Sequence, residues 1–181
     1  MKFLYLTISI ILLSACSSYK KQGVEVKNKL VQTSDSQKGD VIIKETINVL
    51  PNSEIKYQKD ATGAGFVDIV KGNKTVVRYI YDIRPKDKTL RDGNYTQEVL
   101  FQIDGKLREM EAKDEDLSKI NALVGMHGFF RRAGIYPIKK GTISIKLPSK
   151  DEADIHIQIE KPNYMVNQKD IAVKLNLKQQ K

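Results

Sequence analysis

The side chains that could carry out chemistry are few in this chain of 181 residues. The densest acidic run holds five carboxylates, and paired carboxylates can hydrolyse a glycan. These are Glu109, Glu111, Asp114, Glu115 and Asp116. We expect the run to span a strand edge, a turn and a helix start, where acids serve solvation and capping. It lacks the later glycine and terminal glutamate of a calcium loop, so we predict no metal site.

Two histidines complete the candidate catalytic groups. His156, in the alternating segment DIHIQIE, falls on the polar side of a strand and is expected at the surface. His127 lies between two glycines at the end of an expected helix, where an imidazolium can act as a C-terminal cap. The alternative is a general base or metal ligand, but no HExxH motif or nucleophile elbow accompanies it. We therefore predict no catalytic residue and no enzymatic activity.

The only cysteine, Cys16, lies where an apolar segment gives way to a polar one. Lys2 precedes an apolar run over residues 3–13, which is too short to span a bilayer and is typical of a signal-peptide core. The sequence Leu13-Ser14-Ala15-Cys16 resembles the lipobox of bacterial lipoproteins. That resemblance implies cleavage before Cys16, a diacylglycerol on its thiol and an N-acyl chain such as palmitate on the new amino terminus. Two or three such chains hold a protein stably on a membrane. We expect no other cofactor.

The resemblance also implies a location in the cell envelope. Ser17 follows the cysteine in place of an aspartate, which resembles the outer-membrane address of Gram-negative lipoproteins. We expect residues 1–15 to be the signal peptide and residues 16–40 to be the lipidated N-terminus and a flexible tether. A single β-rich domain is expected over residues 41–181. Within the tether, residues 24–26 alternate and could instead form an edge strand.

The charge of the chain limits its partners. Removal of residues 1–15 takes away one lysine and no acid, so that 30 basic and 22 acidic side chains remain, a formal charge of +8. In an exported protein this balance favours anionic headgroups, lipopolysaccharide phosphates or acidic polymers over nucleic acid. The alternative is that the lysines only keep the domain in solution.

Two segments contain residue types that are common at binding sites. The segment over residues 84–94 is a charged loop longer than a hairpin requires, and long loops on rigid sheets often bind partners. The segment over residues 127–138 combines aromatic rings with guanidinium groups, which are enriched at interfaces. The predicted partner-binding residues are Arg84, Lys86, Lys88, Arg91, Phe129, Phe130, Arg131, Arg132 and Tyr136. Alternatively, the first loop is only solvated and the aromatic rings close one end of the fold.

The elements that must position these residues are mostly strands with a period of two. Alternating segments at 41–50, 65–70, 74–83, 95–104, 141–148, 154–160 and 170–177 predict strands. Residues 106–112 are expected to return from the 95–104 strand as a hairpin, and residues 114–130 show helical spacing. We therefore predict a mainly β fold: an antiparallel β-sandwich or a partly open barrel of about seven or eight strands, with one short α-helix.

These observations favour a membrane-anchored envelope lipoprotein with a non-catalytic binding or assembly role. Its partner is expected to be an envelope protein or an anionic surface polymer. One alternative is a periplasmic hydrolase that uses the carboxylates near 109–116 on an envelope glycan. Another is a small-ligand carrier with an apolar pocket between the sheets.

Overall fold

The structure is a computed structural model that describes residues 29–90, 92–129, 133–160 and 170–178. Antiparallel strands dominate it, as the alternating pattern predicted, but they number more than seven or eight. The elements are β1 (Leu30–Lys38), β2 (Val41–Lys59), β3 (Gly65–Lys71), β4 (Lys74–Pro85), β5 (Tyr95–Asp104), β6 (Met110–Lys113), the 3-10 helix η1 (Asp114–Ser118), β7 (Leu123–Gly128), β8 (Gly134–Pro137), β9 (Gly141–Ser149), β10 (Glu152–Ile159) and β11 (Asp170–Asn176). Within these residues, no helix has the length and apolar character that a membrane crossing requires.

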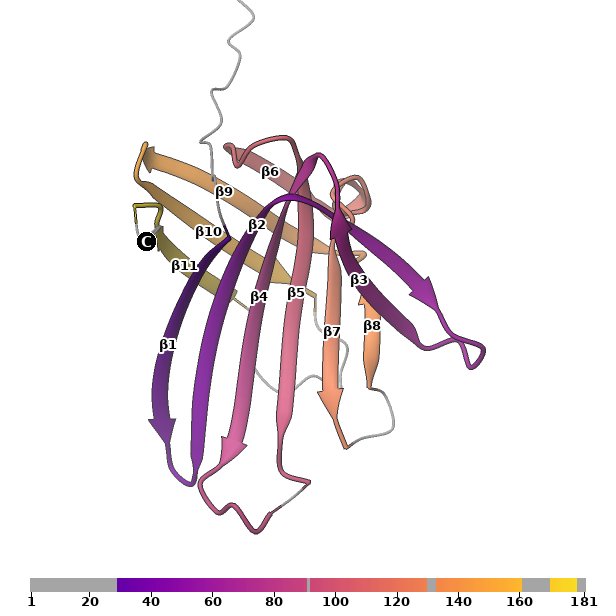
Figure 1. The fold of residues 1–181 in the computed structure, drawn as a ribbon, viewed down its shortest axis with the longest axis vertical. Coiled ribbons are helices and arrows are strands. Elements are labelled where there is room, and N and C mark those ends of the chain that lie inside the picture. The colour runs from indigo at the N-terminus through magenta and orange to yellow at the C-terminus, as the bar shows by residue number, and fades with distance from the viewer. Residues whose placement is uncertain (1–28, 91, 130–132, 161–169, 179–181) are drawn as a thin grey trace, which may run out of the picture.

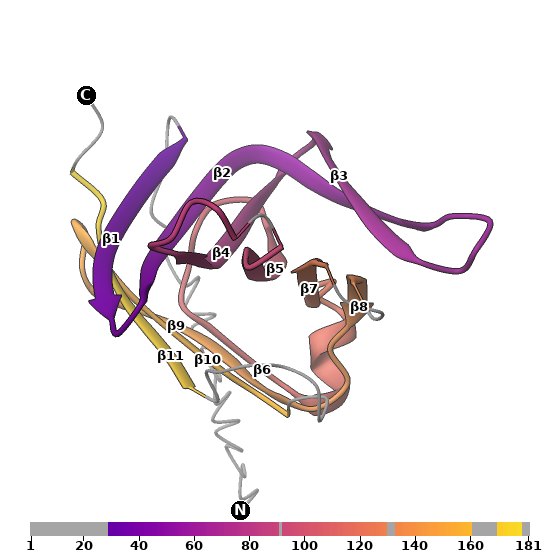
Figure 2. The ribbon, with the colours of Figure 1, turned by 90° about the horizontal axis from the view of Figure 1, so that it is seen from below.

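Two antiparallel sheets make up the molecule (Figure 1). The large sheet has the order β1-β2-β4-β5-β7-β8, with β3 paired to β2, and the small sheet has the order β11-β10-β9-β6. The small sheet faces the concave side of the large sheet, and the two do not close into a barrel (Figure 2). Of the two predicted forms, the structure is therefore the β-sandwich.

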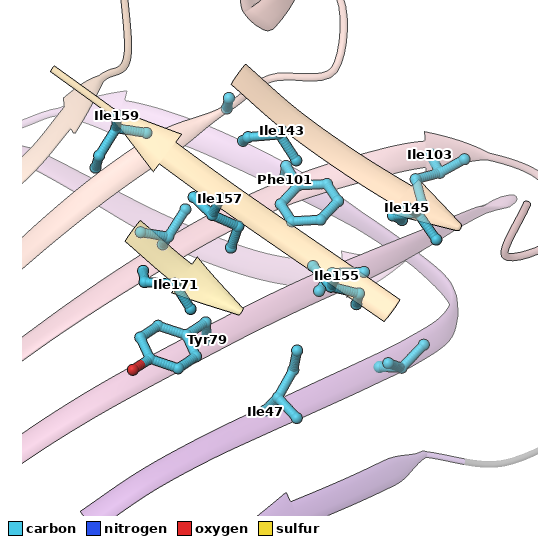
Figure 3. Close-up of a cluster of buried hydrophobic side chains, with 14 of the residues drawn as sticks. Ile47, Tyr79, Phe101, Ile103, Ile143, Ile145, Ile155, Ile157, Ile159 and Ile171 are labelled. Atoms are coloured by element: carbon cyan, nitrogen blue, oxygen red, sulfur yellow. The ribbon is translucent and has the colours of Figure 1, made fainter. Parts of the chain in front are cut away.

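The interior of the sandwich is filled by the apolar faces of both sheets (Figure 3). Ile143 and Ile145 of β9, with the alternate isoleucines of β10, point toward Tyr79 and Phe101 of the large sheet. Each of these side chains is at most 4% exposed, so burial of apolar surface holds the two sheets together. The strands predicted over 141–148 and 154–160 are confirmed as β9 and β10.

A second apolar cluster lies on the convex face of the large sheet. Strand β2 bends at Pro51-Asn52, where its register to β4 shifts, and then pairs with β3. The resulting hairpin, Ser53–Lys71, is called the β2–β3 arm. It covers Val76, Leu100 and Leu123 with Ile55. The arm therefore covers part of the second face of β4, the face that carries Val76.

Side-chain amides complete the pairing of strand edges at two places. The backbone N–H of Ile55 donates to Oε1 of Gln102 at 2.9 Å, and Nδ2 of Asn121 donates to the carbonyl oxygen of Ile55 at 3.4 Å. On the other side of the sandwich, Gln32 of β1 donates to the carbonyl oxygen of Lys174 at 2.8 Å and accepts from the N–H of Asn176 at 3.4 Å. In each case the amide substitutes for part of a neighbouring strand.

The predicted helix over residues 114–130 is wrong. Only Asp114–Ser118 is helical, as a single 3-10 segment, and Leu123–Gly128 forms strand β7. Asn121 has a positive φ of 49°, which reverses the chain direction between the two elements. Leu123 packs under the β2–β3 arm while Val124 and Met126 face the sandwich interior, so β7 is covered on both sides. A strand covered on both faces shows no alternation, and its apolar run resembles part of a helix.

Two further expectations are corrected. Residues 106–112 do not return beside β5, because the chain crosses to the small sheet, where β6 pairs with β9. Leu107, with no exposed surface, is buried in the sandwich core along this crossing. The boundary of the folded domain also lies earlier than residue 41, because Leu30–Lys38 of the expected tether pairs with β2 along its whole length.

Candidate interaction site

Strand register brings the two predicted binding segments to one end of the large sheet. Val41 pairs with Pro85, Ile83 pairs with Tyr95, and Tyr95 pairs with Gly128. The β1–β2 turn at 39–40, the described residues 86–90 and 92–94 of the β4–β5 loop, and Phe129 therefore lie at the same end, at the bottom of Figure 1. We call this region the loop end. The N–H of Lys86 donates to the carbonyl oxygen of Asp40 at 2.8 Å, which ties the first two segments together.

The β4–β5 loop starts with a turn organised by Asp87. Its Oδ1 accepts the N–H of Thr89 at 2.9 Å and the Thr89 hydroxyl at 2.7 Å. These hydrogen bonds, the hydroxyl first, lower the pKa of Asp87 below its ordinary value of 3.8. The N–H of Leu90 also donates to the carbonyl oxygen of Asp87 at 3.3 Å. The turn presents Leu90 to solvent, with 57% of its surface exposed.

The basic residues predicted in this loop have different environments. Arg84 lies on β4, where its Nε is 2.6 Å from Oδ2 of the buried Asp82. Lys86 and Lys88 are exposed, and neither ammonium group has an ion-pair partner among the described residues. They are available to an external anion, whereas part of the Arg84 guanidinium is already bound.

The aromatic residues of the second segment also differ in their exposure to solvent. Phe129 follows β7 and is 85% exposed. Tyr136 lies on β8 and packs, half-buried, against the sandwich core. Tyr136 therefore contributes to the packing of the fold, whereas the Phe129 ring is open to solvent. The other predicted residues, Cys16, Arg91, Phe130, Arg131 and Arg132, lie outside the described residues.

A buried ionic cluster that the sequence analysis missed lies beside the loop end. Glu98 of β5 is only 2% exposed, and its two oxygens have different partners. Oε2 lies 2.6 Å from Nε of Arg78, and Oε1 lies 2.6 Å from Nε2 of His127. Because an ionised carboxylate only accepts hydrogen bonds, Nε2 of His127 carries the hydrogen. We call Arg78, Glu98 and His127 the ionic cluster.

The ionic cluster keeps Glu98 ionised despite its burial. Burial alone would raise the pKa of Glu98, but the hydrogen bond from His127 and the positive charge of Arg78 outweigh it. The pKa is lowered from its ordinary value of 4.5. Gly125 of β7, paired with Glu98, leaves room for this arrangement. A Cβ atom on Gly125 would lie 2.6 Å from Cγ of Glu98.

A carboxylate that orients an imidazole is also found in general-base catalysis, so the surroundings of His127 matter. Thr96 is its cross-strand neighbour, and the Thr96 hydroxyl donates to Oδ1 of Asp82 at 2.7 Å. That hydroxyl is therefore engaged with a carboxylate instead of with the imidazole. In the described residues, no group of three or more His, Cys, Asp or Glu side chains could hold a metal ion. The ionic cluster joins β4, β5 and β7 next to the loop end.

The carboxylates near 109–116 have local partners. Oε1 of Glu109 accepts the N–H of Leu147, and Oδ1 of Asp114 accepts the N–H of Gly141. These two amides lie six residues apart on β9, a separation of about 20 Å. Asp116 pairs with Lys119 at 2.7 Å. The structure therefore does not bring Glu109 and Asp114 into one carboxylate pair.

His156 is exposed on the outer face of the small sheet, as the alternation predicted. It lines a shallow hollow of about 290 Å³ with Thr142, Ser144 and Gln158. A larger hollow of about 570 Å³ lies where β1 approaches β11 and is lined by Gln32, Asp154 and Lys174 among others. Neither hollow is lined by a residue of the loop end.

Comparison of the chain with protein-family models, with curated proteins and with solved structures finds no match.

Proposed function

We propose that this protein is a lipid-anchored lipoprotein of the cell envelope whose β-sandwich has a non-catalytic binding role, and that it binds through the loop end. The lipobox Leu13-Ser14-Ala15-Cys16 supports the anchor. One observation carries the choice of site: Leu90 and Phe129 are 57% and 85% exposed at the same end of the large sheet. Solvent exposure of large apolar side chains is unfavourable, so such positions often mark an interaction surface.

The position of the loop end relative to the anchor supports this role. Leu30 pairs with Val49, and β1 runs from there to the turn at the loop end. Nine strand residues cover about 30 Å, so the chain enters the sandwich well away from that turn. A partner at the loop end therefore does not compete for space with the point where the anchored segment joins the fold.

Site-specific photo-cross-linking in intact cells tests the proposed site. A photoreactive amino acid replaces Leu90 or Phe129, and in a matched control it replaces Phe66, which is 41% exposed on the β2–β3 arm. We expect adducts from positions 90 and 129 that are absent or much weaker at position 66. Equal adduct yields at all three positions would refute the loop end as the binding site.

The anchor is tested separately with a fatty-acid probe. Replacement Cys16→Ser should abolish labelling of the protein and release it from membranes. Retained labelling in this variant would refute the anchor and leave the cross-linking result at the loop end unaffected.

A further inference from the structure

We infer that the loop end is a second membrane contact, which docks on the anionic lipid surface of the bilayer and inserts Leu90 and Phe129 at the boundary between headgroups and acyl chains. The inference deepens the proposed function and rests on it, because it assigns a partner to the same site. The lipid anchor then supplies one attachment, and the loop end supplies a second, reversible one.

The exposed apolar side chains differ in how far they project from the fold. Six large apolar side chains are exposed among the described residues. Four of them, on β1, β2 and β3, are 38–48% exposed: Val31, Ile42, Phe66 and Val70. The two that exceed 50% lie at one end of the sheet: Leu90 in the β4–β5 loop, and Phe129 directly after β7, the strand that pairs with β5. Apolar side chains that project from loop tips insert into the interfacial region of a bilayer at low cost, since they are already outside the fold.

Two cations beside these residues are available to lipid phosphates. Lys86 and Lys88 flank the Asp87 turn, and their ammonium groups have no ion-pair partner in the described part of the chain. Long lysine stems can follow an apolar surface while the ammonium group reaches lipid phosphates. Asp40, Asp87 and Asp92 also lie at the loop end and offset these two positive charges. Apolar insertion is therefore the main contribution, and the lysines add to it only through direct contact with phosphates.

Chain length permits both attachments at once. Thirteen residues lie between Cys16 and Leu30, and an extended chain over that stretch reaches at most about 50 Å. Leu30 lies about 30 Å from the turn at the loop end along β1. The loop end can therefore reach the leaflet that holds the anchor. Attachment to that leaflet raises the effective concentration of lipid at the loop end, so a weak intrinsic affinity suffices. A partner that is not bound to the membrane has no such advantage.

Vesicle binding by the mature chain without its lipid tests the inference. Residues 16–181 with Cys16→Ser retain every described strand, since all lie between Leu30 and Asn176. Co-sedimentation with vesicles of phosphatidylethanolamine and phosphatidylglycerol is compared with vesicles of phosphatidylcholine alone. The double variant Leu90→Asp/Phe129→Asp is compared with the matched double variant Phe66→Asp/Val70→Asp. Thermal unfolding checks that both variants are folded.

We expect binding to the anionic vesicles that exceeds binding to phosphatidylcholine. The loop-end double variant should bind at least about tenfold more weakly, because both inserted side chains are lost, and the β3 double variant should bind unchanged. Failure of the mature chain to bind anionic vesicles even at about millimolar lipid, the order of effective concentration that a tether supplies, would overturn the inference. So would equal binding by the two double variants. If vesicle binding fails while positions 90 and 129 still cross-link to a protein in cells, the loop end is a protein-binding site, and the proposed function survives.

Discussion

Nε2 of His127 lies 2.6 Å from Oε1 of Glu98, across the β5–β7 pair and one residue before the end of β7. The same carboxylate binds Arg78 on β4, so one buried acid connects three neighbouring strands. This connection lies at the base of the segment that carries Phe129. It anchors the loop end to the rigid part of the sheet.

The lowered pKa of Glu98 predicts a loss of stability in acid. An acid whose pKa is lower in the folded state contributes stability above its unfolded value, here near 4.5, and this stability is lost as the pH falls through the folded value. Urea unfolding between pH 7 and pH 3 should show this decline. Glu98→Gln should lose about 1–3 kcal/mol at pH 7 and show a flatter pH profile.

Glu54→Gln serves as the control for this measurement. Glu54 forms ion pairs with Lys56 and Lys74 at 3.6 and 3.9 Å, and its side chain is 30% exposed. Its replacement should cost less than about 1 kcal/mol. An identical pH profile for wild type and Glu98→Gln would contradict the role of the ionic cluster.

Gly125→Ala should destabilise the sheet through Glu98. The added Cβ would lie 2.6 Å from Cγ and 2.8 Å from Oε1 of Glu98, so the carboxylate must move away from Arg78 or His127. We expect a loss of about 1–3 kcal/mol in chemical denaturation. In a Glu98→Ala background the same change should cost much less, because the clashing atoms are absent. Additive effects of the two substitutions would show that the clash lies elsewhere.

Gln102→Leu should weaken the attachment of the β2–β3 arm to the large sheet. Gln102 is 7% exposed, and its Oε1 accepts the N–H of Ile55, which the variant leaves buried without this acceptor. We expect a loss of about 1–3 kcal/mol and faster hydrogen exchange at the Ile55 amide. Gln32→Leu is the matched control, because the Gln32 amide makes similar hydrogen bonds to β11 but is more exposed. This variant should lose less than about 1 kcal/mol. Unchanged exchange at Ile55 would refute the role of Gln102.

Charge reversal at the loop end should weaken vesicle binding moderately. Lys86→Glu/Lys88→Glu removes two cations near the lipid phosphates, and each lysine contributes about 1 kcal/mol near an anionic membrane surface. Binding of the mature Cys16→Ser chain to anionic vesicles should fall by roughly tenfold, less than in the Leu90→Asp/Phe129→Asp variant, and the remaining binding should depend less on salt. Lys150→Glu, on the turn between β9 and β10 away from the loop end, should have little effect (Figure 1). An equal loss in this control would show a general charge effect instead of a local contact.

Sequence patterns predicted the parts of the fold in which one strand face is buried and the other is exposed to water. Ile155 and Ile157 of β10 alternate with polar residues, and their inward orientation followed directly. Strand β7 was missed because both of its faces are buried, which only tertiary packing reveals. The crossing of the chain from β5 to β6 was missed because a Gly turn after a strand also fits a hairpin.

The candidate site was partly predictable. Exposed Lys86, Lys88 and Phe129 could be identified from loop composition, and strand register then placed them at one end. The ionic cluster could not be identified in this way, because Arg78, Glu98 and His127 are 20 and 29 residues apart and only the pairing of three strands brings them together. One local signal was present: Glu98 directly precedes the apolar run Val99-Leu100-Phe101, and a carboxylate so placed requires a partner.

The contact of Gln32 with Lys174 and Asn176 also bears on how copies of the protein coexist. The unpaired edge of a strand is a template on which another chain can pair and aggregate. Molecules confined to a membrane surface collide more often than molecules free in three dimensions, so an open edge would be a greater hazard there. Gln32 occupies this template on β11 from within the same molecule. The Gln32 side chain therefore shields this part of the β11 edge from pairing with a second copy of the chain.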